Sequence, residues 1–266
     1  KDITLGQYFP GNSIAHKLDP RTKILLVTLY IIALFSAKGW MGYAVMAVTL
    51  AACVKVSHVG LRALVRGLKP LVFIIAFTGI LNMFFTPDTH YLWEWGILRV
   101  SVKGIENALF MVIRIMLLVM GTFLMTYTTS PIRLTDGLES LLNPLKKIHV
   151  PVHELAMMMA IALRFIPTLI EETDKIMSAQ KARGADFDSG NIFQKAKALV
   201  PILVPLFISA FRRADELATA MECRCYHGGE GRTKLHVLKY QRRDYVALAG
   251  GVVILVLVVA LRRLGA

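Results

Sequence analysis

The sequence predicts an all-α, polytopic membrane protein with about five transmembrane helices and a cytoplasmic insert of long, crossed amphipathic helices. Of its 266 residues, 55% are hydrophobic and 18% are charged, against about 25% charged in soluble domains. Its uncharged apolar runs approach the roughly 20 residues that a helix needs to cross a hydrocarbon core of about 30 Å. A helix satisfies its own backbone hydrogen bonds there, so each run is expected to be helical.

Four apolar runs account for five spans, because the first run is long enough for two. They are residues 24–54, 71–86, 107–128 and 245–261. The first holds one charge, Lys38, beside Gly39 in its middle, so we expect two short spanning helices that meet at a tight turn. A single buried helical hairpin is the alternative. Arg114 interrupts a later run and would lie in the bilayer, where an arginine either snorkels to the interface or faces a protein partner.

The positions of Lys and Arg predict the orientation of the chain. Four lie in the opening segment and four in the second loop, residues 55–69, which has no acidic residue. Cytoplasmic loops are enriched in Lys and Arg, so the N-terminus is expected inside the cell and, after an odd number of spans, the C-terminus outside. Arg262 and Arg263 oppose the second assignment. The opening segment lacks the pattern of a secretory signal, so no processed leader is expected.

We therefore expect a multi-pass protein of the cell membrane with three regions. Residues 1–128 would hold four transmembrane helices and a cytoplasmic N-terminal segment, residues 129–243 a cytoplasmic helical domain, and residues 244–266 a C-terminal transmembrane helix. The lipid bilayer is accordingly the first partner that the composition implies.

The long insert combines many charges with a helical period. Residues 128–243 contain 17 Lys and Arg and 12 Asp and Glu, too many for a hydrocarbon environment. Apolar residues recur three and four apart over 155–176 and again over 196–221, which predicts two amphipathic helices of roughly 30 residues, about 45 Å each. Proline within each pattern is expected to bend it. Their apolar faces either pack on the rest of the chain or offer a surface to another membrane protein.

An arginine between two small residues stands near the end of each long helix. The triplets are Ala182-Arg183-Gly184 and Cys223-Arg224-Cys225. Small neighbours leave the guanidinium uncovered, and its planar fork can bind a carboxylate of a partner through two hydrogen bonds. The alternative is an ordinary cation in the last turn, where the helix dipole favours positive charge. Their repetition favours the first interpretation.

The chain resembles the transmembrane T component of energy-coupling-factor (ECF) transporters, vitamin and metal importers of the ATP-binding-cassette (ABC) class. The resemblance covers nearly the full length. It is carried by Leu18-Asp-Pro-Arg-Thr-Lys23, Arg164-Phe-Ile-Pro167, the triplet at Arg183, Phe211-Arg-Arg-Ala214 and the stretch from Arg224 to Tyr226. The second triplet departs from the family's usual Ala-Arg-Gly, so Cys223 and Cys225 carry over only as small neighbours.

The resemblance implies that the two long helices are coupling helices whose arginine motifs dock into grooves on two cytoplasmic ABC ATPase subunits. The implied docking residues are Ala182, Arg183, Gly184, Cys223, Arg224 and Cys225. It also implies an exchangeable substrate-binding membrane subunit, the S component. The chain would then be a non-catalytic coupling subunit of an importer for vitamins or metal ions, transmitting ATP-driven motion from the ATPases to the S component.

The residues themselves suggest no catalytic site, cofactor or metal. The stretch from Gly228 to Lys234 has the wrong spacing for the phosphate loop G-x-x-x-x-G-K-S/T, so ATP hydrolysis is expected in partner subunits. Cys223-x-Cys225-x-His227 is atypically spaced for zinc. The net charge of +13 is explained by a cytoplasmic membrane face, and no basic stretch is interleaved with aromatic residues as in a nucleic-acid binder.

One alternative function remains open at this point. Asp186-Phe-Asp188 could hold Mg²⁺ in an integral membrane enzyme that acts on a lipid diphosphate, because paired carboxylates suit that ion. A single acidic pair directly after a helix-ending glycine is also typical of a solvated loop or a helix cap.

Overall fold

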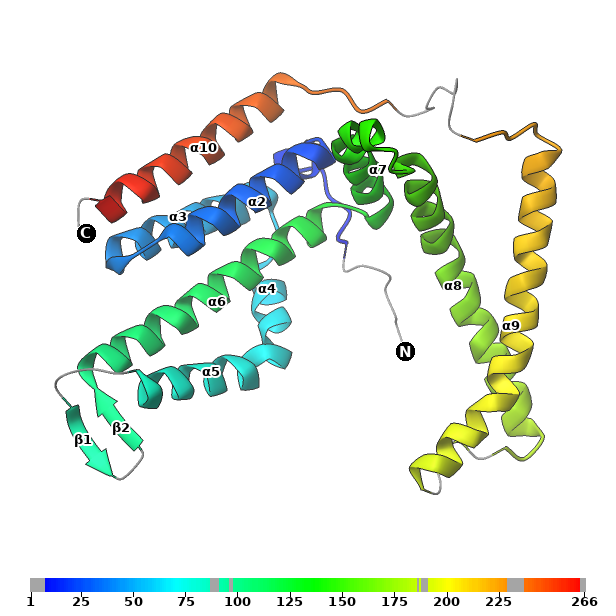
Figure 1. Ribbon diagram of the computed structural model, residues 1–266, viewed down its shortest axis with the longest axis horizontal. Coiled ribbons are helices and arrows are strands. Elements are labelled where there is room, and N and C mark those ends of the chain that lie inside the picture. The colour runs from blue at the N-terminus through cyan, green and yellow to red at the C-terminus, as the bar shows by residue number, and fades with distance from the viewer. Residues whose placement is uncertain are drawn as a thin grey trace. The chain divides into compact units, whose positions relative to one another are not determined.

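The computed structural model describes residues 8–86, 91–95, 98–185, 187, 191–228 and 237–263. The chain forms two compact units, one of Lys1–Leu141 with Leu238–Ala266 and one of Leu142–Val237. Their helices are labelled in Figure 1. The division into units does not identify the residues that lie in a bilayer. The membrane and cytoplasmic regions therefore stay a prediction, with bounds 1–128, 129–243 and 244–266.

The first unit is built from helices with short connections. They are α1 (Ile14–Lys17), α2 (Pro20–Ser36), α3 (Gly39–Ser57), α4 (Leu61–Leu68), the 3-10 helix η1 (Lys69–Leu71), α5 (Val72–Phe85), α6 (Val102–Thr128), α7 (Pro131–Leu142) and α10 (Arg242–Arg263). The expected break between two helices at Lys38-Gly39 is confirmed. Gly39 has φ +66°, a conformation that glycine adopts without a Cβ penalty.

Two elements form where the apolar runs predict only loops. The short helix α4 lies between α3 and η1, and its Leu and Arg residues have high helix propensity. The strands β1 (Tyr91–Trp95) and β2 (Leu98–Ser101) form an antiparallel pair between α5 and α6. Aromatic residues, which favour strands, make up most of β1, and β2 contains the β-branched Val100.

Six helical segments in the described part of the chain are long and apolar enough to cross a membrane. They are Gly39–Ser57, Leu61–Phe85, Val102–Thr128, Val152–Ala182, Phe193–Glu222 and Arg242–Arg263. This set differs from the five expected spans because it includes both long helices of the insert and leaves out α2, which has 17 residues. Length and composition alone cannot separate a span from a long amphipathic helix. The polytopic, all-α fold class is confirmed.

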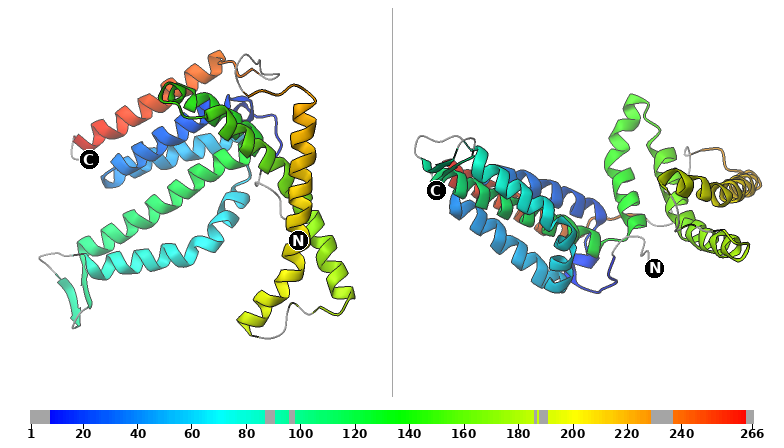
Figure 2. Two further views of the ribbon diagram at one scale, coloured as in Figure 1. Left: turned by 45° about the vertical axis from the view of Figure 1, so that its right-hand side comes forward. Right: turned by 90° about the horizontal axis from the view of Figure 1, so that it is seen from below.

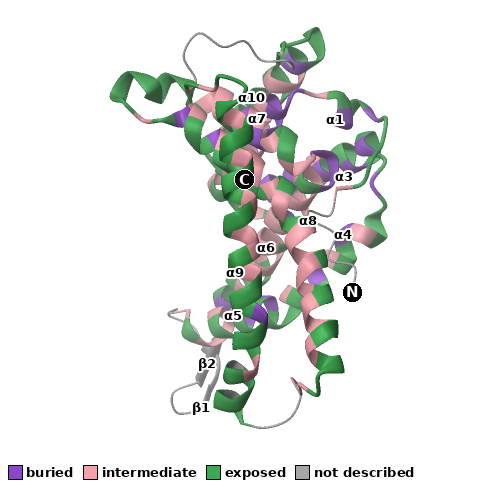
Figure 3. Cartoon of the chain, turned by 90° about the vertical axis from the view of Figure 1, so that its right-hand side faces the viewer, coloured by how far each residue is buried: buried purple, intermediate pink, exposed green. Residues whose placement is uncertain are grey.

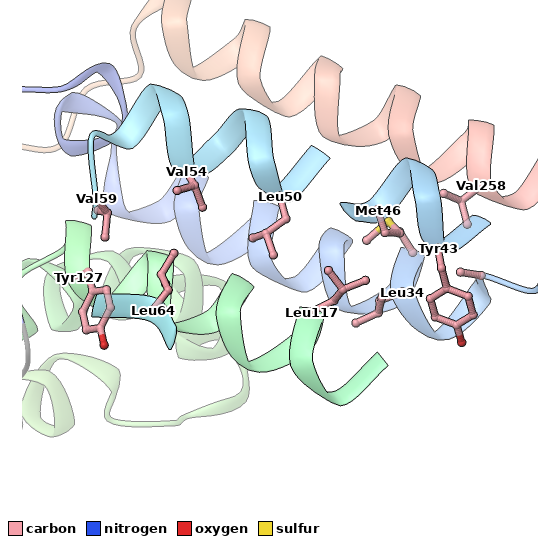
Figure 4. Close-up of a cluster of buried hydrophobic side chains, with 12 residues drawn as sticks. Leu34, Tyr43, Met46, Leu50, Val54, Val59, Leu64, Leu117, Tyr127 and Val258 are labelled. Atoms are coloured by element: carbon pink, nitrogen blue, oxygen red, sulfur yellow. The ribbon is translucent and has the colours of Figure 1, made fainter. Parts of the chain in front are cut away.

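The core of the first unit is a chain of buried apolar side chains between α2, α3, α4, α6 and α10. Figure 4 shows it, with Leu34, Met46, Leu64 and Val258 fully buried. Small residues let these helices approach closely, as in other membrane bundles. A Cβ added to Gly121 of α6 would overlap the ring of Tyr30 on α2. The Tyr30 hydroxyl donates to the Leu117 carbonyl oxygen at 2.9 Å.

The opening stretch that resembles ECF proteins joins the ends of three helices. Asp19 accepts a hydrogen bond from the Arg21 backbone N–H at 2.9 Å and so caps α2. Its own N–H donates to the buried Asp244 carboxylate at the start of α10, at 2.8 Å. Lys23 donates to the Thr128 carbonyl oxygen at the end of α6, at 2.8 Å. These contacts fix the starts of α2 and α10 against the end of α6.

Arg114 of α6 contacts side chains of α2 and α3 in the same chain. Its Nε donates to the Tyr43 hydroxyl of α3 at 2.9 Å. The guanidinium carbon also lies 5.8 Å from the centre of the Phe35 ring, within reach of a cation–π interaction. Of the two alternatives that the sequence leaves open, these contacts favour the protein-facing one.

The second unit contains the 3-10 helix η2 (Asn143–Ile148) and two helices of 31 residues each, α8 (Val152–Ala182) and α9 (Ile192–Glu222). Pro167 lies inside α8, and Pro201 and Pro205 lie inside α9. Both helices continue through their prolines, and the views of Figures 1 and 2 show α9 changing direction in its first half. The predicted pair of long, proline-interrupted helices is confirmed.

The apolar stripe of α9 is largely uncovered. Phe207, Ile208 and Phe211 are exposed, whereas Ile202 is buried. Figure 3 shows exposed residues along both long helices. Within the described part of this unit, the stripe therefore does not serve mainly as a core between α8 and α9, and its exposure is consistent with a surface for lipid or another membrane protein.

Candidate functional site

The first arginine triplet forms the C-terminal cap of α8. The Gly184 N–H donates to the Lys181 carbonyl oxygen at 3.0 Å, and the Ala185 N–H donates to the Gln180 carbonyl oxygen at 3.0 Å. Gly184 has φ +87°. This pair of hydrogen bonds around a left-handed residue is the Schellman motif, in which Arg183 occupies the cap position between the helix and Gly184.

The second triplet forms the same cap at the end of α9. The Cys225 N–H donates to the Glu222 carbonyl oxygen at 2.8 Å, and the Tyr226 N–H donates to the Met221 carbonyl oxygen at 3.0 Å. Cys225 has φ +55°. Arg224 therefore occupies the position that Arg183 occupies in the first triplet, and Cys225 corresponds to Gly184.

This equivalence changes the role of the third residue in each triplet. The sequence interpretation assigns Gly184 and Cys225 the role of small neighbours, but both are the left-handed residues of their caps. Glycine adopts that conformation freely, while an L-residue pays about 1–2 kcal/mol. A Cβ added to Gly184 would meet no atom within 4 Å, so backbone conformation favours glycine there. The signal in the sequence was the glycine itself, which is typical of this cap position.

Both arginines are exposed to solvent. Arg183 and Arg224 belong to the exposed class of residues, and neither guanidinium has a hydrogen-bond or ion-pair partner among the residues that the structure describes. The cap holds the backbone of each arginine rigidly, while the side chain stays available. The helix C-terminus also favours a cation at this position, so the geometry accommodates both interpretations of the triplets.

The two long helices cross each other and run in opposite directions. Arg213 of α9 forms a salt bridge with Glu172 of α8 at 2.8 Å, and the Gln180 side chain of α8 lies 3.5 Å from the Pro201 carbonyl oxygen of α9. Residues later in α8 thus face residues earlier in α9, and Figure 2 shows the pair from two sides. The end of α8 lies near the start of α9, so the two caps stand about one helix length apart, roughly 45 Å.

The remaining candidate residues that the structure describes do not gather into a second site. Cys223 and Cys225 are exposed free thiols, and Nδ1 of His227 lies 2.9 Å from the Cys225 carbonyl oxygen. Among the described residues, no three His, Cys, Asp or Glu side chains gather as metal ligands. Asp186 and Asp188, the basis of the lipid-diphosphate alternative, lie outside the described residues, and no observation favours that alternative.

Comparison with known proteins finds similarity over nearly the whole chain. The family CbiQ, described as "Cobalt transport protein", matches residues 11–235. The "Energy-coupling factor transporter transmembrane protein EcfT" of Ruminiclostridium cellulolyticum is 55% identical over 244 residues, 92% of this chain and 91% of the relative. The protein of the same description from Acidaminococcus fermentans is 55% identical over 262 residues, 98% and 96% of the two chains. That of Bacillus subtilis is 46% identical over 260 residues, 98% of each.

Proposed function

This chain belongs to the CbiQ family of transmembrane transport proteins, together with the transmembrane T components of ECF transporters, and we propose that it acts as their non-catalytic coupling subunit. In this proposal Arg183 and Arg224 dock into two cytoplasmic ABC ATPase subunits. Movement of the ATPases during ATP hydrolysis is transmitted through α8 and α9 to a substrate-binding membrane S component of a vitamin or metal-ion importer.

The observation that carries the proposal is the pair of matching caps at opposite ends of two antiparallel helices. Each cap presents one exposed arginine on a fixed backbone. A guanidinium can bind a carboxylate through two parallel hydrogen bonds, which gives both affinity and a defined orientation. A separation of roughly 45 Å suits two separate partners better than one groove, so relative motion of those partners would act on both ends of the helix pair.

The exposed apolar stripe of α9 supports the second part of the proposal. Phe207 and Phe211 stack with ring centres 6.4 Å apart and lie on one face of the helix, next to the exposed Val204 and Ile208. Contiguous apolar surface of this kind marks contacts with protein or membrane. We assign this face to the S component, because it lies on the same helix as Arg224 and would move with it.

The test is copurification of the ATPases and transport by the double variant Arg183→Ala/Arg224→Ala. Removing one partner of a docked charge pair costs about 2 to 5 kcal/mol at each site, so the double variant is expected to lose both ATPases and substrate uptake. Each single variant should retain the contact of the other motif.

A matched control removes the same charge from the same two helices. Lys175 of α8 and Arg212 of α9 are exposed and lie in the middle parts of their helices, away from the caps, so Lys175→Ala/Arg212→Ala should copurify with both ATPases. Copurification and uptake of the arginine double variant at the level of this control would rule out the docking mechanism.

A further inference from the structure

We propose that α4 and the cavity beside it form a binding surface for the headgroups of anionic phospholipids. The surface lies at the end of the first unit that carries the N-terminal segment and the α3–α4 connection. This inference is independent of the proposed docking of ATPases, because no residue of α8 or α9 contributes to it.

The direction of α4 is the first support. Pro70 in η1 separates α4 from α5, and a proline inside a helix removes a backbone donor and bends the chain. Figure 1 shows α4 running across the direction of α5 and of the neighbouring α6. A short helix that lies across the spans at their end has the orientation of a helix in the membrane interface.

The faces of α4 give the second support. Leu64 and Leu68 are buried, and a Cβ added to Gly67 would come 2.5 Å from the ring of Phe123 on α6. At the border of this face Leu61 and Val65 are 65% and 57% exposed. One face thus packs on α6, while an apolar edge is left outside the protein.

Cations follow that apolar edge around the helix. At 100° per residue, the next positions after Leu61 and Val65 are Lys69, Arg62 and Arg66, all exposed. An interfacial helix presents this sequence of faces, with apolar residues toward acyl chains and Lys and Arg toward headgroups. Long basic side chains also reach from the acyl boundary to the headgroup phosphates.

The positive charge of this region is not compensated. Residues 55–69 contain no Asp or Glu, and within the described part of the chain Arg62, Arg66 and Lys69 have no ion-pair partner. A cavity of about 990 Å³ opens beside the start of α4 and is lined by Lys55 and His58 among others, with no carboxylate in its lining. An anionic headgroup is the ligand chemistry that complements this surface.

The experiment measures lipid binding to the purified full chain in a neutral detergent. Phosphatidylglycerol and phosphatidylcholine are titrated separately, and bound lipid is counted by native mass spectrometry. A cation near an anionic lipid surface contributes about fivefold in affinity, so Arg62→Gln/Arg66→Gln/Lys69→Gln is expected to weaken phosphatidylglycerol binding by about 100-fold. Phosphatidylcholine binding should not change, and Arg62→Lys/Arg66→Lys should keep the affinity.

The matched control removes three exposed cations from the opposite end of the same unit. Lys38 lies in the α2–α3 turn and Arg262 and Arg263 end α10, and Figure 1 shows this turn and the C-terminus away from α4. Lys38→Gln/Arg262→Gln/Arg263→Gln should bind phosphatidylglycerol as the parent does. An equal loss in this control, or equal binding of the two lipids by the parent chain, would overturn the proposal.

Two further measurements remove the remaining ambiguities. Glycerol 1-phosphate, a soluble headgroup analogue, should not compete with the lipid, and efficient competition would show a site for free phosphate instead. If the triple glutamine variant does not fold, the parent chain is tested alone by raising salt from about 0.05 M to about 0.5 M. Screening shortens the range of the attraction severalfold, so salt-independent binding would contradict the proposal.

Discussion

Replacing Cys225 by glycine is expected to stabilise the cap at the end of α9. Cys225 holds φ +55°, a left-handed conformation that costs an L-residue about 1–2 kcal/mol and glycine almost nothing. The greater backbone freedom of glycine in the open state offsets about 0.5–1 kcal/mol of this gain. Taken at the middle of both ranges, the net stabilisation is about 0.8 kcal/mol, which corresponds to about fourfold in the equilibrium for local opening of the cap.

Hydrogen exchange at the cap amides measures this equilibrium directly. The N–H groups of Cys225 and Tyr226 close the cap on the carbonyl oxygens of Glu222 and Met221, so their exchange requires the cap to open. Cys225→Gly should slow the exchange of these amides by about fourfold. Gly184→Ala should have the opposite effect at the first cap, because φ there is +87° and the added Cβ meets no other atom.

The control for this prediction is Cys225→Ser, which removes the thiol and keeps a side chain on the left-handed residue. Its exchange rates should equal those of the parent chain. If the serine variant slowed exchange as much as the glycine variant, the effect would come from the thiol and the backbone explanation would be refuted. If Cys225→Gly left the exchange rates unchanged, the left-handed conformation of Cys225 would not destabilise the cap.

Two predictions concern the first unit and are measured as thermal unfolding in detergent. Asp244 is 2% exposed and its carboxylate accepts hydrogen bonds from two backbone N–H groups at 2.8 Å each. Asp244→Ala should lower the free energy of unfolding by about 2–5 kcal/mol, because both donors lose their partner. A loss below about 1 kcal/mol would contradict this. Gly121→Ala should lower the free energy of unfolding by about 1–3 kcal/mol because its Cβ overlaps the Tyr30 ring. Gly250→Ala, whose Cβ meets no atom within 4 Å, is the control and should raise stability by about 0.5–1 kcal/mol, because glycine in a helix loses more backbone freedom on folding.

The caps also suggest why the arginine motifs end long helices. A Schellman cap ties the two residues after the arginine to the last turn through one hydrogen bond each, so the arginine backbone moves with its helix. Exposed side chains on rigid helix ends can transmit force that a flexible loop would absorb. In the proposed mechanism, α8 and α9 thus act as levers whose ends are set by the caps.

Local properties of the sequence were sufficient for much of the fold. The apolar runs located α3, α5, α6 and α10, and the three-to-four spacing of apolar residues located α8 and α9 with their prolines. These signals depend on neighbours within a few turns. The position of Arg183 at the end of α8 was likewise readable, because Gly184 is a common helix terminator. The left-handed Cys225 was not, because a cysteine gives no sequence signal for that conformation.

Hydrophobicity and helical period in the sequence by themselves determined the class of protein, the approximate spans and the two long helices, because each is set by residues close together along the chain. Only the tertiary structure decided what Lys23, Arg114 and Asp244 do, since their partners are far away in sequence. It likewise turned α4 across the bundle and placed the two arginine caps at opposite ends of an antiparallel pair. Such arrangements depend on packing between distant segments, and local sequence patterns carry no information about that packing.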